Sequence, residues 1–201
     1  MANLYITRHG QTEWNLEGRL QGHKDSSLTE TGKEHARMLK NRLEDVKIDV
    51  VYSSSSGRAL QTANILAGDT HTIHPLDDLR EMSFGKWEGA LHKDFELEDP
   101  DLYHALFNDA SAYKPADSEC IESLQNRAVK AVQTIVDKHA GQNVLIVSHG
   151  ITVKSILAHM EGLSFKDFWK GPFVQGCSLS VIDGSKGKVL VYADTDHIVS
   201  L

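Results

Sequence analysis

Two histidines, near opposite ends of the chain, each stand between a short apolar run and a glycine. His9 follows Leu4-Tyr5-Ile6 and comes directly after Arg8, and His149 closely follows the apolar run 144–147. One Arg-His pair alone is typical of a surface loop. Because the pattern occurs twice, after residues that favour strands, it predicts two imidazoles facing one cleft. In open α/β sheets, ligands bind at the carboxyl ends of the strands.

Phosphoryl transfer suits these residue types, because it needs a nucleophile, cations around the transferring oxygens and a proton for the leaving group. His9 can supply the nucleophilic nitrogen, since its ordinary pKa of about 6.5 leaves it mostly neutral near pH 7. Arg8 and Arg58 offer planar forks for phosphate oxygens and disfavour a charge on His9. We expect His149 to donate to the phosphoryl group and Glu81 to act as acid and then as base.

Other phosphatase chemistries do not fit the sequence. Cysteine-based enzymes place five residues between their cysteine and arginine, whereas six separate Cys120 from Arg127, on a predicted helix. The Asp-x-Asp at 194–196 lies far from any first strand, where aspartate-based enzymes carry theirs. The two histidines within 71–74 are predicted to lie on a strand or a solvated surface rather than to bind a metal. We therefore expect a metal-independent enzyme without a cofactor.

Composition narrows the class of protein further. The 201 residues predict one domain, 1–201, because a domain has about 100–200 residues. The net charge of −7 argues against nucleic-acid binding, so an anionic substrate needs a local basic pocket. Two cysteines are too few for a disulfide framework, and neither a signal peptide nor a membrane span is predicted. We expect a cytoplasmic enzyme acting on a small-molecule phosphate monoester; the sequence leaves the oligomeric state unknown.

The alternation of strands and helices predicts how these residues are positioned: a three-layer α/β/α sandwich with a mostly parallel central sheet. Predicted strands are 4–6, 48–52, 72–76 and 144–147, with a closing hairpin that pairs 177–182 with 188–192. Predicted helices are 29–46, 58–67, 118–140 and 151–160, with a helical cover at about 91–116. Thr29 is the expected cap of the first helix, within which Thr31 and Glu34 have capping-box spacing. Asp117 or Ser118 is the expected cap of the long helix.

Several short motifs join the two histidine motifs in chain order. They are Arg8-His9-Gly10-Gln11-Thr12-x-x-Asn15, Leu28-Thr29-x-x-Gly32, Tyr52-Ser53-Ser54, Arg58-Ala59-x-x-Thr62-Ala63, Leu79-Arg80-Glu81, Gly85-x-Trp87-Glu88-Gly89 and Ser148-His149-Gly150. This ordered set resembles the histidine phosphatase superfamily, also called phosphoglycerate mutase-like, over nearly the whole chain. The resemblance implies a phosphoglycerate mutase-like fold and the same roles for the five residues named above. It adds Asn15 and Gln21 as contacts to the phosphoryl group.

All three binding residues have an alternative interpretation. Asn15 can cap a loop instead of contacting the phosphoryl group, and the same structural alternative stays open for Gln21. Gly150 is expected to let its N–H approach the phosphate, the alternative being a simple turn at the start of a helix. His23 lies close enough to the first motif to line the rim of the pocket.

The segment after Glu81 separates phosphatases from the cofactor-dependent phosphoglycerate mutases of this family. Mutases carry an Arg-His-Tyr-type sequence after the acid, and paired arginines in a longer insert that bind the substrate carboxylate. Here Met82-Ser83-Phe84 follows, and 91–116 contains no arginine, two lysines and six acids. The aromatic residues of that cover suit a less charged leaving group; they are Phe95, Tyr103, Phe107 and Tyr113. The sequence therefore looks closest to the broad-specificity phosphatases, which act through a phosphohistidine, here on His9.

Two other functions stay open: a phosphoglycerate mutase, and a non-catalytic phosphate-binding module on the same fold. The module predicts loss of at least one of the five catalytic candidates, yet all five are present. One motif departs from the family pattern. Many relatives carry Gly-Glu-Ser before the long helix, where this chain has Ser118-Glu119-Cys120. That change affects the expected cover of the pocket, and so its substrate preference, but not the nucleophile or the acid.

Overall fold

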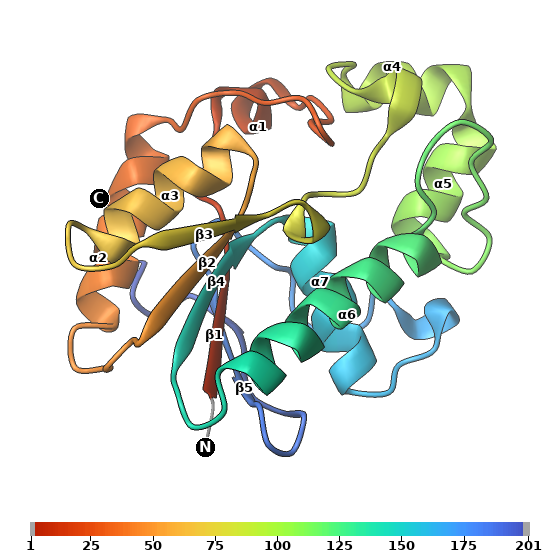
Figure 1. Ribbon diagram of the computed structural model, residues 1–201. Coiled ribbons are helices and arrows are strands. Elements are labelled where there is room, and N and C mark those ends of the chain that lie inside the picture. Colours follow the sequence, from red (N-terminus) through yellow and green to blue (C-terminus); the bar gives the residue numbers. More distant parts are fainter. Residues whose placement is uncertain (1–2, 199–201) are drawn as a thin grey trace.

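A twisted central sheet with helices on both faces forms the body of the protein (Figure 1). The computed structural model describes residues 3–198. The strands are β1 (Asn3–Arg8), β2 (Val50–Ser54), β3 (Ile73–Leu76), β4 (Val144–Ser148), β5 (Leu179–Asp183) and β6 (Lys188–Asp194). The helices are α1 (Glu13–Glu17), α2 (Glu30–Arg42), α3 (Gly57–Ala67), α4 (His92–Glu98), α5 (Pro100–Asn108), α6 (Ile121–Lys138) and α7 (Gly150–Met160). Short 3₁₀ turns occupy Asp77–Leu79, Gly85–Trp87 and Phe165–Asp167.

The strand order is β3-β2-β4-β1-β5-β6. The pairs β1–β4, β2–β4 and β2–β3 are parallel, whereas β5 is antiparallel to β1 and to β6. The predicted mostly parallel sheet with a closing hairpin is therefore confirmed. The parallel arrangement brings the carboxyl ends of β1, β2 and β4 to the same edge of the sheet, which is where the predicted site residues are expected.

Alternating apolar residues explain why both faces of the sheet are covered. In β4, Val144 and Ile146 pack with α6 and α7, whereas Leu145 and Val147 pack with α2 and α3. All five residues of β4 are buried, as expected for a central parallel strand. The three-layer prediction is therefore confirmed, with α2 and α3 on one face and α6 and α7 on the other (Figure 1).

A third apolar cluster lies beyond the sheet and supports the cover. It joins Met82, Phe84 and Trp87, from the segment after β3, to α4, α5 and the first turn of α6. Trp87 stacks on Phe95 of α4, with ring centroids 4.4 Å apart. The cover therefore has an apolar cluster of its own, to which α6 and α7 also contribute, through Leu124, Ile151 and Ala158.

Some helix starts differ from the predictions. Thr29 does cap α2, accepting the Gly32 N–H at 2.9 Å, but the capping box lies on the unpredicted helix α1, not at Thr31 and Glu34. The long helix α6 begins only at Ile121, so neither Asp117 nor Ser118 caps it. The reason is that the Glu119 N–H donates to the Ser83 carbonyl, and this bond ties the chain before α6 to the loop after Glu81.

A close approach between two backbones explains the glycine at position 10. A Cβ at Gly10 would lie 2.5 Å from the carbonyl oxygen of Gly32 in α2. Conversely, a Cβ at Gly32 would lie 2.2 Å from the carbonyl oxygen of Gln11. Two glycines therefore let α2 pack directly against the loop that carries His9.

Candidate active site

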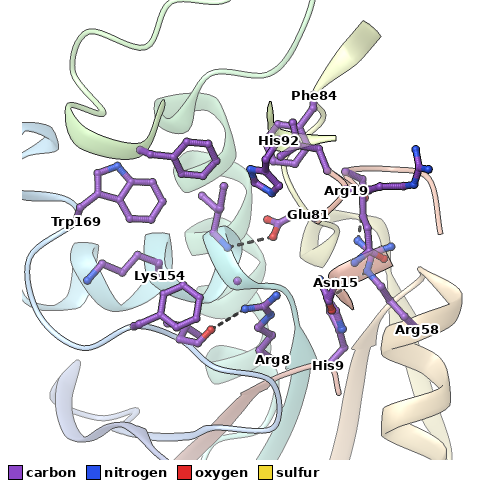
Figure 2. Close-up of a pocket in the computed structure, with 18 of the residues that line it drawn as sticks. Arg8, His9, Asn15, Arg19, Arg58, Glu81, Phe84, His92, Lys154 and Trp169 are labelled. Atoms are coloured by element: carbon purple, nitrogen blue, oxygen red, sulfur yellow. Dashed lines mark hydrogen bonds between the residues drawn. The ribbon is translucent and has the colours of Figure 1, made fainter. Parts of the chain in front are cut away.

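The predicted site lies where β1 and β4 end side by side. Arg8 pairs in register with Ser148, so the residues that follow, His9 and His149, emerge next to each other. The His9 N–H donates to the Ser148 carbonyl at 2.9 Å, and the two imidazole centroids are 5.2 Å apart. A pocket of about 300 Å³ opens over His9, and Figure 2 shows the side chains around it. The structure thus brings the two imidazoles together, as the repeated motif predicts.

Hydrogen bonds determine which nitrogen of His9 can react. Nδ1 lies 2.7 Å from the Gly10 carbonyl oxygen, which can only accept, so Nδ1 carries the ring hydrogen. Nε2 accepts the Nε–H of Arg58 at 3.2 Å and holds the lone pair. Burial, followed by the charges of Arg58 and Arg8, holds the pKa of His9 well below its ordinary value. The imidazole is therefore neutral at neutral pH, with Nε2 as its nucleophilic atom.

The guanidinium of Arg58 is 1% exposed and is held from three sides. Nη1 donates to the Lys24 carbonyl at 2.7 Å, and Nη2 donates to the Gly22 carbonyl at 2.9 Å. Asp25 forms an ion pair with Nη1 at 3.0 Å and also accepts the backbone N–H of Arg58. The N-cap residue of α3 makes no side-chain bond to the helix. Asp25, from another loop, accepts a backbone N–H of the first turn instead and so caps α3. These contacts direct the Nε of Arg58 toward His9.

Arg8 supplies a second cation at the base of the pocket (Figure 2). Its Nη1 donates to the Val174 carbonyl at 3.0 Å, and its guanidinium carbon lies 5.9 Å from the centroid of the Phe173 ring. Its Nε is buried and has no partner among the described residues. A buried donor without a partner is costly, so a bound anion that accepts from Nε would be stabilised.

His149 is completely buried beside His9. Its Nε2 lies 2.7 Å from the hydroxyl oxygen of Ser54, at the end of β2, and its Nδ1 has no partner within residues 3–198. Burial, followed by the charge of Arg58, holds the pKa of His149 well below its ordinary value, so the ring has one hydrogen. When the Ser54 hydroxyl donates to Nε2, that hydrogen is on Nδ1. His149 is not among the residues that line the pocket, so its contact to a phosphoryl group stays a prediction.

The carboxylate of Glu81 sits at the N-terminus of α7. Its Oε1 accepts the N–H groups of Met82 at 3.0 Å and Thr152 at 3.2 Å, and lies 3.1 Å from the Thr152 hydroxyl oxygen. Among the donors of residues 3–198, its Oε2 accepts only the Ile151 N–H, at 3.1 Å. Glu81 lines the pocket (Figure 2), so the less occupied oxygen, Oε2, is the one left to react with a ligand.

An ion pair outside the pocket fixes the segment that carries Glu81. Arg127 donates to the carbonyls of Asp78, Arg80 and Glu81 at 2.9–3.1 Å. Glu119 holds the other side of the guanidinium, with N–O distances of 2.7 and 2.8 Å. Glu119 is the residue that this chain keeps from the family's Gly-Glu-Ser motif. The departure at positions 118 and 120 therefore leaves this contact intact.

The three predicted binding residues all line the pocket, with different partners. Asn15 uses Oδ1 to accept the Thr12 N–H at 3.1 Å in the capping box of α1. Gln21 uses both ends of its amide, donating to the Thr12 hydroxyl at 2.9 Å and accepting from Ser26 at 3.2 Å. Gly150 is the first residue of α7. Their predicted contacts to a phosphoryl group stay predictions.

Away from the histidines, apolar and aromatic side chains make up most of the pocket wall. They are Leu20, Phe84, Phe107, Ile151, Trp169, Phe173 and Val174. Of the four cover aromatics predicted for this role, only Phe107 lines the pocket, so the prediction is wrong for the other three. Phe95 and Tyr113 are buried inside the cover, where they stabilise it. Trp169 and Phe173 follow α7, in a segment that the sequence analysis left unassigned.

The two long cations of the outer pocket already have partners. Arg19 forms an ion pair with Glu17 and donates through Nη1 to the Gly89 carbonyl at 2.8 Å. The Nζ of Lys154 donates to the Tyr192 hydroxyl at 2.7 Å and to a backbone carbonyl, and burial lowers its pKa. Both cations are therefore held by contacts within the protein, and only part of their hydrogen-bonding capacity is left for a substrate.

Histidines outside the two motifs behave differently from one another. His92 lines the pocket near Glu81 (Figure 2), and burial lowers its pKa, so the ring is neutral there. No local signal marked His92, because it stands alone between a leucine and a lysine. His23, expected at the rim, is exposed and is not part of the pocket wall. His74 is exposed on β3, as predicted, whereas the ring of His71 is half-buried and contacts the Ile48 carbonyl oxygen at 2.9 Å.

Clusters of three or more His, Cys, Asp or Glu side chains that could hold a metal ion are absent from residues 3–198. Over the same residues, no helix is both long and apolar enough to cross a membrane.

Comparisons with known proteins agree with this geometry. The family model for the histidine phosphatase superfamily (branch 1) matches residues 4–195. The solved structure of Bacillus stearothermophilus YhfR is 40% identical, with a TM-score of 0.95, covering 98% of this chain and 99% of that one. Two curated relatives are each 31% identical. Phosphoglycerate mutase-like protein 4 of Arabidopsis thaliana aligns over 98% of this chain and 87% of its own length. The adenosylcobalamin/alpha-ribazole phosphatase of Escherichia coli K12 aligns over 87% and 86%. The chain therefore belongs to the histidine phosphatase superfamily, branch 1.

Proposed function

We propose that this protein hydrolyses phosphate monoesters through a phosphohistidine on His9. One observation carries the proposal: a neutral His9 lines the pocket beside two arginines and a carboxylate, and the lone pair of its Nε2 accepts only a long bond, 3.2 Å, from Arg58 among the described residues. A neutral, oriented nitrogen is what nucleophilic attack on phosphorus requires. Arg8 and Arg58 supply the positive charge that stabilises the phosphoryl oxygens.

The first half of the reaction forms a P–N bond. Nε2 of His9 attacks phosphorus, and the bond from phosphorus to the ester oxygen breaks. The Nε–H of Arg58, now 3.2 Å from Nε2, then has a phosphoryl oxygen as its acceptor, and the Nδ1–H of His149 has another. The leaving oxygen takes its proton from Glu81, whose Oε2 is the carboxyl oxygen with a single donor.

The second half restores the enzyme. Glu81, now a carboxylate, takes a proton from water as the water attacks phosphorus, and the P–N bond breaks. The electron pair of that bond returns to Nε2, and inorganic phosphate leaves. The Nδ1–H bond to the Gly10 carbonyl, 2.7 Å long, holds the ring in one orientation through both halves.

The outer pocket supports apolar or aromatic leaving groups and a broad rather than narrow specificity. Its wall is largely apolar, with few polar groups to fix one substrate, and Arg19 and Lys154 are engaged within the protein. Metal independence belongs to the same proposal, since arginines provide the charge that a metal ion would supply. We place the protein in the cytoplasm, as the sequence analysis expects.

The test compares His9→Ala with the wild type on p-nitrophenyl phosphate, an alkyl phosphate and 3-phosphoglycerate. We expect His9→Ala to lose at least roughly 10³-fold in kcat/KM and all covalent labelling. Rapid quench and mass spectrometry should find phosphate on the peptide containing His9 in the wild type. His104→Ala removes an exposed histidine of α5 and is the matched control.

Several results would contradict the proposal. Normal rates for His9→Ala, or phosphate found on serine, cysteine or aspartate, would remove His9 from its role. Phosphate binding without turnover would indicate the binding module. A dominant interconversion of phosphoglycerates, stimulated by 2,3-bisphosphoglycerate, would indicate a mutase. Activity that EDTA abolishes and a divalent ion restores would end the claim of metal independence.

A further inference from the structure

The hydroxyl of Thr152 lies between two acceptors. Its Oγ1 is 2.9 Å from the Arg80 carbonyl oxygen and 3.1 Å from Oε1 of Glu81, and the side chain is fully buried. A hydroxyl has one hydrogen, so it can serve only one of these acceptors at a time. No role in the reaction described above uses this group.

Both acceptors keep other donors when the hydroxyl turns away. The Arg80 carbonyl still accepts from Arg127 Nη1 at 2.9 Å. Oε1 of Glu81 still accepts the N–H groups of Met82 and Thr152 itself. Neither orientation therefore leaves a buried polar group without a partner, and turning the hydrogen costs little. The two orientations differ only in whether Oε1 receives a third donor.

We infer that Thr152 is a positioning residue that adjusts to the protonation state of Glu81. When Glu81 is a carboxylate, the Thr152 hydroxyl donates to Oε1. When Oε2 carries the proton that the leaving group will take, the hydroxyl turns to the Arg80 carbonyl. The inference rests on the proposed function, in which Glu81 is acid in one step and base in the next. It assigns to Thr152 the task of stabilising the charged state selectively while Oε2 stays free to react.

The surroundings of Glu81 make this hydroxyl separable from other influences. The guanidinium groups of Arg8 and Arg58 interact with its carboxylate through their charges, and the neutral rings of His9 and His92 lie in the same pocket. Arg127 reaches the segment through backbone carbonyls. Thr152→Val leaves all of these groups in place and keeps the shape of the side chain, so a change in titration reports the hydroxyl alone.

The first measurement does not depend on activity. The protein is labelled with ¹³C at the glutamate carboxyl, and Glu81→Gln identifies the Glu81 signal. Removing one donor from a carboxylate favours the protonated form, so the Glu81 signal should titrate about one pH unit higher in Thr152→Val. Thr152→Ser keeps the hydroxyl and should titrate close to the wild type. Thr152→Ala is a second hydroxyl-free variant, with less bulk, should valine disturb the fold.

The second measurement uses turnover. In kcat/KM for an alkyl phosphate, the basic limb at which protonated Glu81 disappears should move upward by the same amount in Thr152→Val. The profile for p-nitrophenyl phosphate should not move in this way, because nitrophenolate departs without a proton. Ser155→Ala removes another buried hydroxyl of α7, one without a partner among the described residues, and should change neither profile.

The outcomes separate this inference from the proposed function. A Glu81 signal unchanged in both hydroxyl-free variants, or a serine variant shifted as far as the valine variant, overturns the inference. A shift of equal size in Ser155→Ala also overturns it, because the loss of any buried hydroxyl of α7 would then change the titration of Glu81. A shifted signal in a protein that hydrolyses no ester supports the Thr152–Glu81 contact and refutes the phosphatase proposal alone.

Discussion

Two buried imidazoles should make the stability of this protein sensitive to mild acid. His9 and His149 are at most 3% exposed. Burial and the nearby arginines hold the pKa of each well below its ordinary value. In the unfolded chain the same two rings bind protons below about pH 6.5. The unfolded state therefore takes up protons over a range in which the native state does not, and lowering the pH shifts the balance toward unfolding.

The size of the effect follows from that difference. If both native rings stay neutral, each histidine lowers the free energy of unfolding by about 1.4 kcal/mol between pH 7.5 and 5.5. The pair then contributes about 2.8 kcal/mol, which is a large part of the ~5–15 kcal/mol of a typical protein. The sign is fixed: this stability is complete above the unfolded pKa and is lost as the pH falls toward the folded pKa values.

The assay is urea unfolding at pH 7.5, 6.5 and 5.5, followed by circular dichroism. Asparagine does not titrate, so His149→Asn should show a pH dependence smaller by about 1.4 kcal/mol over this range. His104→Asn, which replaces an exposed histidine of α5, is the control. A His149→Asn variant with the full wild-type pH dependence would show that the native ring accepts a proton, and a neutral His149 would have to be abandoned.

Two further predictions concern the support of the site. Asp25→Ala removes the ion pair of Arg58 and leaves its guanidinium held by two backbone carbonyls and by His9. The kcat/KM for p-nitrophenyl phosphate should then fall by about 10- to 100-fold through misplacement of the guanidinium, with Glu30→Ala on the surface of α2 as control. An unchanged kcat/KM would mean that Asp25 only caps α3. Gly32→Ala places a Cβ 2.2 Å from the Gln11 carbonyl oxygen and should cost about 1–3 kcal/mol in urea unfolding, whereas Lys33→Ala beside it should cost little. A stable Gly32→Ala protein would show that α2 can move away from the His9 loop.

Local patterns predicted the parts of the site that depend on strand order. His9 and His149 each follow an apolar strand, and parallel pairing alone brings strand ends together. The first turn of α3 likewise placed Arg58 at the same edge of the sheet. These features depend on hydrophobic periodicity and on sheet topology, which a single sequence records.

Contacts between distant loops were not predictable in this way. Asp25 caps α3, which begins 32 positions later in the sequence. Glu119 was predicted to lie within the long helix, but its N–H donates to the Ser83 carbonyl and the helix begins after it. The prediction that four cover aromatics line the pocket was wrong for the same reason. The packing of the cover places Phe95 inside its apolar cluster and Phe107 in the pocket wall. Such choices depend on which surfaces meet in three dimensions, and residue type alone does not encode them.

The apolar cluster of the cover has a consequence for how this protein can change over evolutionary time. The cluster around Met82, Trp87 and the helices α4 and α5 is distinct from the two clusters that enclose the sheet. Substitutions confined to α4 and α5 therefore act on this cluster before they reach the strand ends that hold His9 and His149. Proteins with this fold can therefore acquire new substrates through substitutions in the cover while the catalytic residues stay the same.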